Sequence, residues 1–476
     1  MGVVTGQPPE PVLEGRKPGD PRLVSFNQKR LWYLEQLTPG TAVYNVPYIM
    51  RLTGPLNPNA LREAMEAVIA RHESLRTVFL APGGNPVPVL LSKWRLEFHC
   101  LDFRSPTATE ALAIHETEVQ VKVKAEAARG FNLARDLLFR AMLIRVGEND
   151  WGFFHNSHHI AVDGGSYDVL HKEASLFYAS IVSGSRISLP EPPIQYSDFA
   201  LWQTRYLSGS RLDQLSAYWR NQLAGAPPMH LPCDQARPAV LSGRGRRYFF
   251  SPSKEGIRRI GELSKASGTT PFRAATAAFA VLLGCYAGAD DVSIGTPVAP
   301  QARAGMESAI GFFVNTLVLR INLSGQPTFR ELMRRAHQVV QGAIEHSDLT
   351  LDKLVEAVRP PRDAGRMPLF QVNFRWLRGP IASLHLKDIV STPPRAVDSG
   401  TAKFELSIEI DAGTGEGCFI EYSTDLFEEE TVAQFAADME TVRHALVAEP
   451  DVPLEKITAV QEVRERIGRR RVGHCT

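Results

Sequence analysis

Two consecutive histidines, followed by an aspartate and two glycines, form the segment of this sequence best suited to chemistry. The segment reads HHIAVDGGS from His158 to Ser166, and residues 151–158, WGFFHNSH, are typical of a β-strand that leads into a turn. An imidazole titrates near neutral pH, so one of the two histidines could act as a base. Asp163 follows four residues after His159. The glycines after it let its carboxylate fold back and fix both the loop and the ring.

A metal site is the first alternative, and the pattern argues against it. Neighbouring side chains on a strand point to opposite faces, so only one of the two histidines can face a cleft. The sequence also has no HExxH motif and no carboxylate-rich partner motif. A second alternative is that both histidines are buried core or turn residues, and a short isolated motif does not exclude it.

The composition is that of an ordinary globular protein of 476 residues, with 44% hydrophobic and 22% charged residues. This length suits two domains. The formal net charge of +1 and the lack of a long apolar run predict neither nucleic acid nor a membrane as partner. The N-terminus has no apolar signal stretch, and the five cysteines are scattered without a CxxC pair. We therefore expect a cytoplasmic protein.

Helical and strand patterns alternate along the chain and predict a mixed α/β fold. Residues 1–20 read as a disordered leader, 21–186 as an N-terminal lobe with the histidine motif, and 187–455 as a C-terminal lobe. The Pro-rich stretch 187–195 is the expected crossover between the lobes. Residues 456–476 form a tail, whose basic end, 464–476, we expect to be frayed. A helix capped by Asn57, with Pro58 in its first turn, is among the best-marked elements.

From about Val24 to Leu454 the sequence resembles the condensation-domain family of non-ribosomal peptide synthetases. Seven segments carry the resemblance and occur in family order: Ser25–Trp32, Arg71–Phe79, His158–Gly164, Tyr196–Trp202, Ile310–Thr316, a weakened sixth at His346–Asp348, and Arg362–Leu369. The second reads RHESLRTVF and the fifth IGFFVNT. These agree with RHExLRTxF and GxFVNT of the family.

The resemblance implies a fold, a reaction and a set of partners. Family members fold as two chloramphenicol-acetyltransferase-like lobes in a V, with the active site in a tunnel between them. A carrier protein presents the donor thioester on its phosphopantetheine arm, and the acceptor is carrier-bound or a free small molecule. No bound cofactor or metal is implied, and we expect a monomer. Carrier proteins are usually acidic, so a local basic patch should dock them.

The resemblance also assigns roles to single residues. His159, the second histidine of the motif, is the catalytic group, either as general base or as a group that positions substrate and stabilises charge. His158 and Gly164 support it. Asp163 corresponds to a carboxylate that pairs with an arginine, for which Arg76 is our candidate, and we interpret this pair as structural. Residues predicted to line or brace the cleft are Ser166, Trp202 and Asn315.

Several positions depart from the family pattern and leave substrate and partner open. Gly165 replaces a bulky residue, which should enlarge or loosen the turn and permits a positive φ. Asn27 stands in place of Ala, and Met367 in place of Asn. In the sixth element Ser347 and Thr350-Leu351-Asp352 replace Gln and Pro-Phe-Glu.

Alternatives to amide formation follow from the same resemblance. A hydroxyl acceptor, such as that of a polyketide chain, would give an ester. A coenzyme A-dependent HxxxD acyltransferase and a non-catalytic recruitment platform are further alternatives. An epimerisation domain is disfavoured by the first and fifth elements, and a heterocyclisation domain by the histidines themselves. The stretch ITAVQEVRERI resembles a linker towards an adenylation domain, so both a free-standing enzyme and an excised domain fit.

Overall fold

The structure of the chain is a computed structural model. It describes residues 11–104, 110–185, 187–299, 303–361, 363, 365–377, 379 and 381–473. The chain divides into two compact units. The first comprises Met1–Leu215, Pro300–Phe313 and Ile381–Pro394, and the second comprises Ser216–Ala299, Val314–Pro380 and Arg395–Thr476. The predicted crossover at 187–195 does not coincide with this division, because the first unit continues to Leu215 and includes two later segments.

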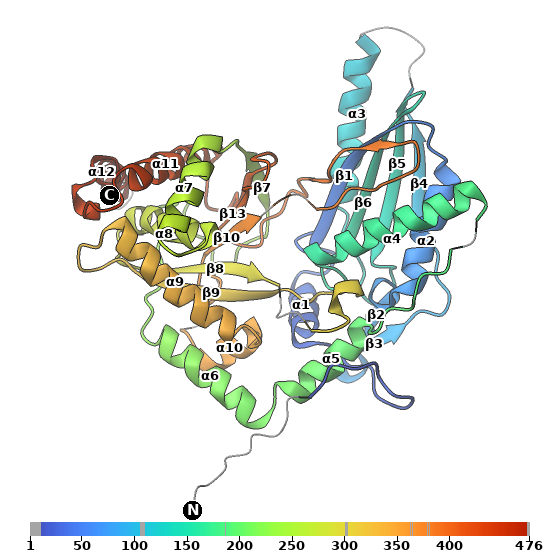
Figure 1. Cartoon of the computed structure of the whole chain (residues 1–476), viewed down its shortest axis with the longest axis horizontal. Coiled ribbons are helices and arrows are strands. Elements are labelled where there is room, and N and C mark those ends of the chain that lie inside the picture. The colour runs from blue at the N-terminus through green and yellow to red at the C-terminus, as the bar shows by residue number, and fades with distance from the viewer. Residues whose placement is uncertain are drawn as a thin grey trace, which may run out of the picture. The chain divides into compact units, whose positions relative to one another are not determined.

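The first unit is built on a sheet with the strand order β11-β1-β6-β5-β4. Strand β6 pairs antiparallel with β1 and β5, while β4 pairs parallel with β5. Helices α2 and α4 pack against each other and lie over one face of the sheet in Figure 1. The bounds are β1 Asn45–Thr53, β4 Glu97–Asp102, β5 Phe139–Gly147, β6 Asp150–His158, β11 Val390–Ser391, α2 Pro58–Arg71, α3 Glu110–Ala127 and α4 Gly164–Ser183.

Smaller elements complete this unit at the end of β6. They are α1 Phe26–Leu37, the turn η1 Glu73–Arg76, the hairpin β2 Thr77–Leu80 and β3 Val87–Leu90, and α5 Tyr196–Tyr206. The capping residues predicted for α2 are confirmed: the Asn57 side chain accepts hydrogen bonds from the amides of Asn59 and Ala60. The apolar side chains Leu61, Met65, Val68 and Ile69 share one face of α2 and are buried.

The second unit holds a sheet of order β7-β14-β13-β10-β8-β9. Strand β10 is parallel to β13 and β8, and the other neighbours are antiparallel. The almost wholly buried helix α8 packs against α7, α9, α11 and α12. The bounds are β7 Gly245–Phe249, β8 Asp291–Val298, β9 Asn315–Asn322, β10 Val372–Leu377, β13 Leu406–Asp411, β14 Phe419–Ser423, α7 Lys254–Ala266, α8 Pro271–Ala287, α9 Phe329–Glu345, α10 Leu351–Val358, α11 Glu429–Ala448 and α12 Thr458–Gly473. The predicted mixed α/β class is confirmed.

The predicted frayed tail was wrong for residues 464–473; residues 474–476 lie outside the described part of the chain. Residues 458–473 form helix α12, which packs against α8 and α11. Val460, Val463 and Ile467 recur at helical spacing and are buried in this contact. The basic side chains that suggested a solvated end lie on the same helix. The narrow apolar stripe is enough to hold the helix against α8 and α11.

The predicted disordered leader was also wrong for residues 11–20; residues 1–10 lie outside the described part of the chain. The indole of Trp202 donates to the carbonyl of Pro11 over 2.6 Å. Arg16 forms ion pairs with Asp198, at 2.9 Å, and with Glu73, at 3.3 Å. Each of these contacts spans a long stretch of sequence, so local composition could not predict them. Among the described residues, no helix is both long and apolar enough to span a bilayer.

Candidate active site

His159 lies immediately after β6, and contacts on two sides fix its ring. Its backbone amide donates to the carbonyl of Tyr44 at 2.8 Å, which places the residue beside the start of β1. Its Nδ1 lies 2.8 Å from the carbonyl oxygen of Val162. A carbonyl can only accept, so Nδ1 carries the proton and the neutral ring has its lone pair on Nε2. This is the tautomer that a base acting through Nε2 requires.

Phe312 holds the imidazole of His159 from a second direction. The two ring centroids are 4.7 Å apart, with the planes tilted by 59°. The His159 side chain remains half-buried, so His159 is not a core residue, and its catalytic role stays a prediction. A ring held by both a hydrogen bond and an aromatic contact loses little freedom when a substrate binds.

His158 has a different environment, as alternation along a strand requires. It is completely buried, and its Nδ1 accepts a hydrogen bond from the amide of Ile160 at 3.1 Å. The rings of Tyr44 and Phe131 pack near it at 6.2 and 6.1 Å. These contacts make His158 a support for the turn that carries His159.

Asp163 joins the turn to the start of α4 and to the segment 310–313. It is the N-cap of α4, and its Oδ1 accepts from the amide and the hydroxyl of Ser166 at 3.1 and 2.9 Å. Its Oδ2 accepts from the amide of Phe313 at 3.0 Å. Each oxygen of this buried carboxylate therefore bonds a donor of the scaffold, which supports a structural role for Asp163.

Arg76 belongs to η1, and its Nη1 donates to the carbonyl of Leu91 at 3.3 Å, just after the β2–β3 hairpin. The predicted ion pair of Arg76 with Asp163 stays a prediction.

Ser166 and the two glycines form the first turn of α4. The Ser166 hydroxyl lies 2.9 Å from the carbonyl of Gly311 and accepts from the Gly311 amide at 3.1 Å. Ser166 is buried, and its predicted place along the cleft stays a prediction. Neither Gly164 nor Gly165 has a positive φ, so the turn does not use the conformational freedom that Gly165 permits. A Cβ on Gly165 would meet nothing closer than 3.7 Å, so the space left by the missing side chain is real.

Polar side chains from three further family elements hold the histidine turn and segment 310–313. The sequence alone assigned them no role. Gln28 of α1 donates to the carbonyl of Ile160 at 3.2 Å. The Tyr196 hydroxyl donates to the carbonyl of Phe312 at 2.8 Å. Ser74 donates to the carbonyl of Ile310, also at 2.8 Å. The first, second and fourth family elements thus brace the third and the first half of the fifth.

Gly311 is the glycine that the site requires. A Cβ added to it would lie 1.9 Å from the ring of Tyr196, far inside van der Waals contact. The backbone of segment 310–313 can therefore approach α5 closely only without a side chain at this position. That approach places Phe312 against His159.

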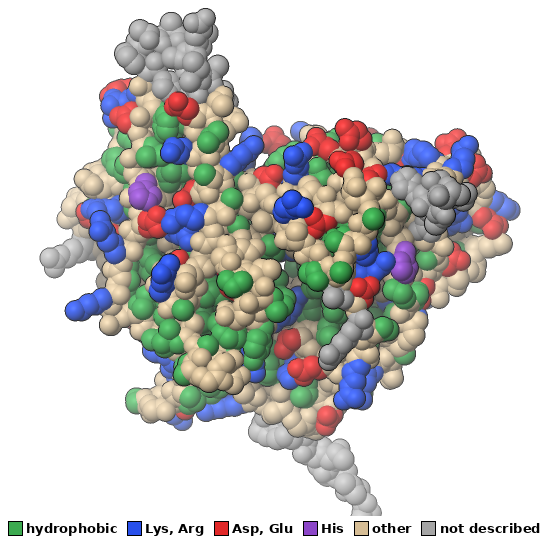
Figure 2. Space-filling model, turned by 180° about the vertical axis from the view of Figure 1, so that it is seen from behind, with side chains coloured by type: hydrophobic (Ala, Val, Ile, Leu, Met, Phe, Trp, Pro, Cys, Tyr) green, Lys and Arg blue, Asp and Glu red, His purple; other side chains and the backbone are tan. Residues whose placement is uncertain are grey.

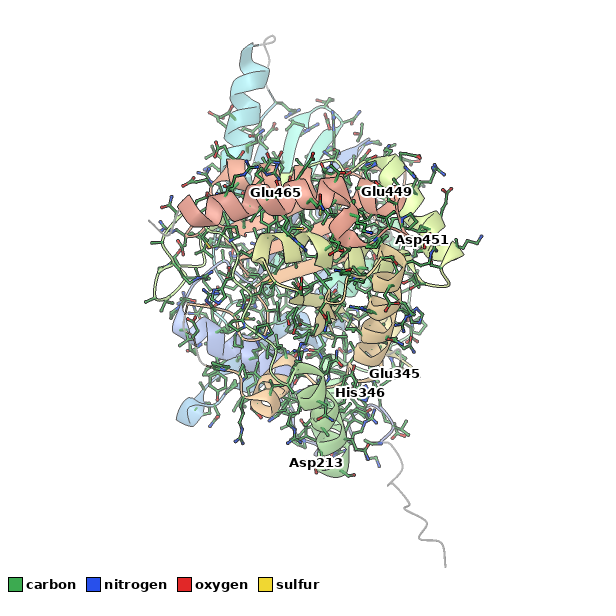
Figure 3. All side chains as sticks on the ribbon, turned by 90° about the vertical axis from the view of Figure 1, so that its left-hand side faces the viewer. Asp213, Glu345, His346, Glu449, Asp451 and Glu465 are labelled. Carbon is green, nitrogen blue, oxygen red and sulfur yellow. The ribbon has the colours of Figure 1, made fainter. Side chains whose placement is uncertain are left out.

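Trp202 and Asn315 brace other parts of the molecule. Besides its bond to Pro11, the Trp202 ring stacks on Tyr206, with the centroids 4.6 Å apart. Asn315, in the second unit, is buried, and its amide donates to the carbonyls of Ser347 and Leu349 at 2.8 and 2.7 Å. It thereby fixes the loop that follows His346. Figure 3 labels His346, which lies at the end of α9.

No group of three or more His, Cys, Asp or Glu side chains in the described part of the chain is arranged to hold a metal ion. What the described geometry offers is a half-buried imidazole with a defined tautomer, mounted on a rigid turn. Such a group can accept a proton or stabilise charge in a bound substrate.

Comparisons with known proteins agree over almost the whole chain. Residues 21–466 match the family model described as Condensation domain. Over 446 residues the chain is 37% identical to a linear gramicidin synthase of Brevibacillus parabrevis, a match that covers 92% of this chain and 6% of that protein. The chain therefore spans only a small part of this much longer relative.

Two solved structures show the same fold. The protein SgcC5 from Streptomyces globisporus is 26% identical, with a TM-score of 0.74 and coverage of 90% of this chain and 99% of that one. The X-domain from teicoplanin biosynthesis, solved in complex with OxyB, is 25% identical, with a TM-score of 0.82 and coverage of 95% and 99%.

Proposed function

Because the chain belongs to the condensation-domain family, we propose that it joins an acyl or aminoacyl group, held as a thioester on a carrier protein, to an amine acceptor. The product is an amide, the bond that extends a peptide in natural-product biosynthesis. The observation that carries this proposal is the His159 ring, whose Nδ1 is held by the Val162 carbonyl so that the Nε2 lone pair can serve a substrate.

In the proposed reaction the acceptor nitrogen attacks the thioester carbonyl, and the carbon–sulfur bond breaks. The attacking amine loses a proton, which Nε2 of His159 takes, and the departing phosphopantetheine sulfur receives a proton in return. No proton is consumed overall. Alternatively, the proton passes from the attacking nitrogen directly to the departing sulfur, and the same imidazole acts by positioning the amine and by stabilising the charge of the tetrahedral intermediate.

The remaining motif residues act through His159 and not on the substrate. Asp163 is a poor candidate for the base, because its oxygens already accept hydrogen bonds from Ser166 and Phe313. Phe312 orients the imidazole, and Tyr196 holds Phe312. Asp163, Phe312 and Tyr196 are thus positioning residues in this proposal.

The test is a competition between donors and between acceptors, followed by intact-mass analysis. The same acyl group is offered at equal concentration on a phosphopantetheinylated carrier and on coenzyme A, with an amine and a matched alcohol as acceptors. We expect amide formed from the carrier donor. A preference of more than about tenfold for coenzyme A would make the chain a plain acyltransferase, and preferred ester formation would replace the amine by a hydroxyl acceptor.

Salt dependence adds a second readout on the carrier. Figure 2 shows basic and acidic side chains interspersed on the visible face of the described residues, in line with the net charge of +1. A docking site for an acidic carrier is therefore local, and its contribution should appear as a rate that falls as salt rises. A rate independent of salt would argue against electrostatic docking.

A second candidate function is recruitment of another protein without catalysis. The X-domain, 25% identical to this chain, has been solved in complex with OxyB. The intact histidine motif and its ordered support favour catalysis here. Recruitment would gain support if no donor and acceptor pair reacted while a partner protein bound stably.

A further inference from the structure

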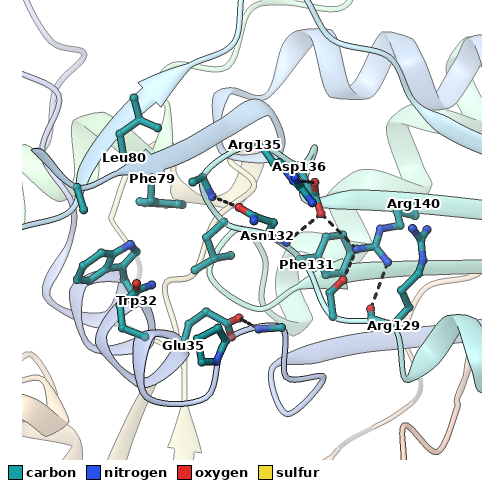
Figure 4. Close-up of a pocket in the computed structure, with 17 residues that line it drawn as sticks. Trp32, Glu35, Phe79, Leu80, Arg129, Phe131, Asn132, Arg135, Asp136 and Arg140 are labelled. Atoms are coloured by element: carbon teal, nitrogen blue, oxygen red, sulfur yellow. Dashed lines mark hydrogen bonds and ion pairs between the residues drawn. The ribbon is translucent and has the colours of Figure 1, made fainter. Parts of the chain in front are cut away.

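A cavity of about 590 Å³ lies in the first unit, between the end of α1, the end of β2 and the loop that leads into β5. Figure 4 shows the residues that surround it. Neither His159 nor segment 310–313 is among its lining residues, so the cavity is separate from the candidate active site. Polar groups form the larger share of its wall, and Trp32, Phe79, Leu80, Phe131 and Leu133 contribute apolar side chains.

One polar group in this wall has an unmet hydrogen-bonding requirement. Glu35 is only 4% exposed. Its Oε1 accepts from the amide of Gly40 at 2.8 Å, while its Oε2 is buried and has no hydrogen-bond partner among the described residues. Burial raises the pKa of this carboxyl to about 7. Leaving a buried carboxyl oxygen without a partner is costly, so a ligand that supplies a donor would be favoured there.

Two other charged side chains of the wall, the buried Arg140 and the partly exposed Asp136, already have partners. Arg140 stacks on the ring of Phe131, with 3.7 Å between the guanidinium carbon and the ring centroid, and it donates to the backbone carbonyl of Arg129 at 3.2 Å. Asp136 accepts from a backbone amide at 2.9 Å and faces the Arg140 guanidinium at 3.7 Å. In Figure 4 Arg129 and Arg140 lie across the cavity from Trp32, whereas Glu35 lies nearer to that indole.

We propose that this cavity binds a small organic cation, a primary ammonium on an aromatic or branched aliphatic body. The ammonium group donates to Oε2 of Glu35, and the apolar body packs against Trp32 and Phe79. Three features select this class of ligand: the Glu35 carboxylate favours a charged donor, the apolar side chains of Trp32 and Phe79 favour an apolar body, and aromatic faces attract a cation. The site does not depend on the proposed condensation reaction.

The experiment measures binding to the full-length chain by titration calorimetry, with three ligands that share a phenyl body. These are 2-phenylethylammonium, the neutral 2-phenylethanol and the anionic 3-phenylpropanoate. We expect saturable binding of the ammonium, with the alcohol at least about tenfold weaker and the carboxylate weaker still. Trp32 supplies a second signal, a fluorescence change that saturates at the same ammonium concentration and is lost in Trp32→Phe.

Two variants locate the contact. Glu35→Gln keeps an oxygen for the Gly40 amide but removes the charge, and it should weaken ammonium binding by at least about tenfold. Asp136→Asn also removes a carboxylate from this cavity. Because the oxygens of Asp136 already have partners, this variant should change the affinity by no more than about twofold.

Three results would overturn the proposal: no saturable binding of the ammonium, equal affinity for the alcohol, or an unchanged affinity in a folded Glu35→Gln protein. In each case the second oxygen of Glu35 would serve water alone. Should Glu35→Gln fail to fold, the comparison of the three ligands on the unaltered chain still decides. Because no turnover is measured, failure here leaves the condensation proposal untouched.

Discussion

Two regions of the first unit place histidines from the same strand in opposite roles. At the end of β6, His159 is half-buried, and one ring nitrogen is fixed by a backbone carbonyl. Three residues before His158 on that strand, His155 is completely buried and meets His171 of α4, with their Nε2 atoms 3.1 Å apart. The same side chain thus serves a candidate reaction in one region and packing in the other.

Hydrogen bonding defines the protonation of the buried pair. Nδ1 of His171 lies 2.7 Å from the carbonyl of Ala382 and must donate to it, so Nε2 of His171 accepts and Nε2 of His155 donates. Burial lowers the pKa of His171 to about 4, and burial together with the neighbouring His171 lowers the pKa of His155 well below 6.5. Burial and the partner atoms, and not residue type, therefore decide whether an imidazole on this strand can exchange protons.

Substitution of His159 should have the largest effect, a loss of condensation activity that substitution of a buried histidine does not match. His159→Ala should slow condensation by at least about 100-fold, the usual scale for loss of a general base. Its melting temperature should stay near that of the native chain, because the side chain is half-buried. His158→Ala should slow the reaction less while lowering the melting temperature more. Equal turnover in a folded His159→Ala protein would remove the catalytic assignment.

The support under His159 should respond in stability as well as in rate. Asp163→Ala removes the N-cap of α4 and leaves the Phe313 amide without its acceptor, which together should cost about 2–4 kcal/mol of unfolding free energy. Urea unfolding gives the value. Asp163→Asn keeps an acceptor oxygen and should lose less. A fully stable Asp163→Ala protein with reduced turnover would instead assign Asp163 a direct catalytic role.

The buried pair should make the protein sensitive to acid. Its folded-state pKa values lie below that of free histidine, so the unfolded chain binds more protons below pH 6.5. The free energy of unfolding should therefore fall as pH drops from 6.5 towards 4, by up to about 1.4 kcal/mol per pH unit from His171 alone. Urea unfolding across this range measures the slope. A slope unchanged by the double substitution His155→Phe and His171→Leu would show that other groups cause it.

The packing behind Phe312 should give a smaller response, mainly in stability. Gly311→Ala would bring a methyl group into the ring of Tyr196 and should cost about 1–3 kcal/mol of stability, with some loss of rate as Phe312 shifts from His159. Gly165→Ala is the matched control, because its backbone is helical and its Cβ would have room. It should be neutral or slightly stabilising. Equal stability of the two variants would contradict the close approach described for Gly311.

Local sequence was enough to predict the histidine motif, the strand that carries it, the helix cap at Asn57, and the mixed α/β class. These features depend on residues within one or two turns of each other, where periodicity and capping chemistry act. The turn expected after the histidines is shorter than the two glycines suggest, because helix α4 already begins at Gly164.

How the site is held depends instead on tertiary contacts. Phe312 and Phe313 reach the histidine turn from about 150 positions along the chain, and Tyr196 fixes them from a third segment. The ties of residues 11–22 to α5 and η1, and the packing of α12, are of the same long-range kind. Such contacts depend on which surfaces meet once the sheets have formed, and no local pattern in the sequence records that. Tautomer, burial and orientation at His159 therefore follow from the fold, whereas the presence of an imidazole there follows from the sequence.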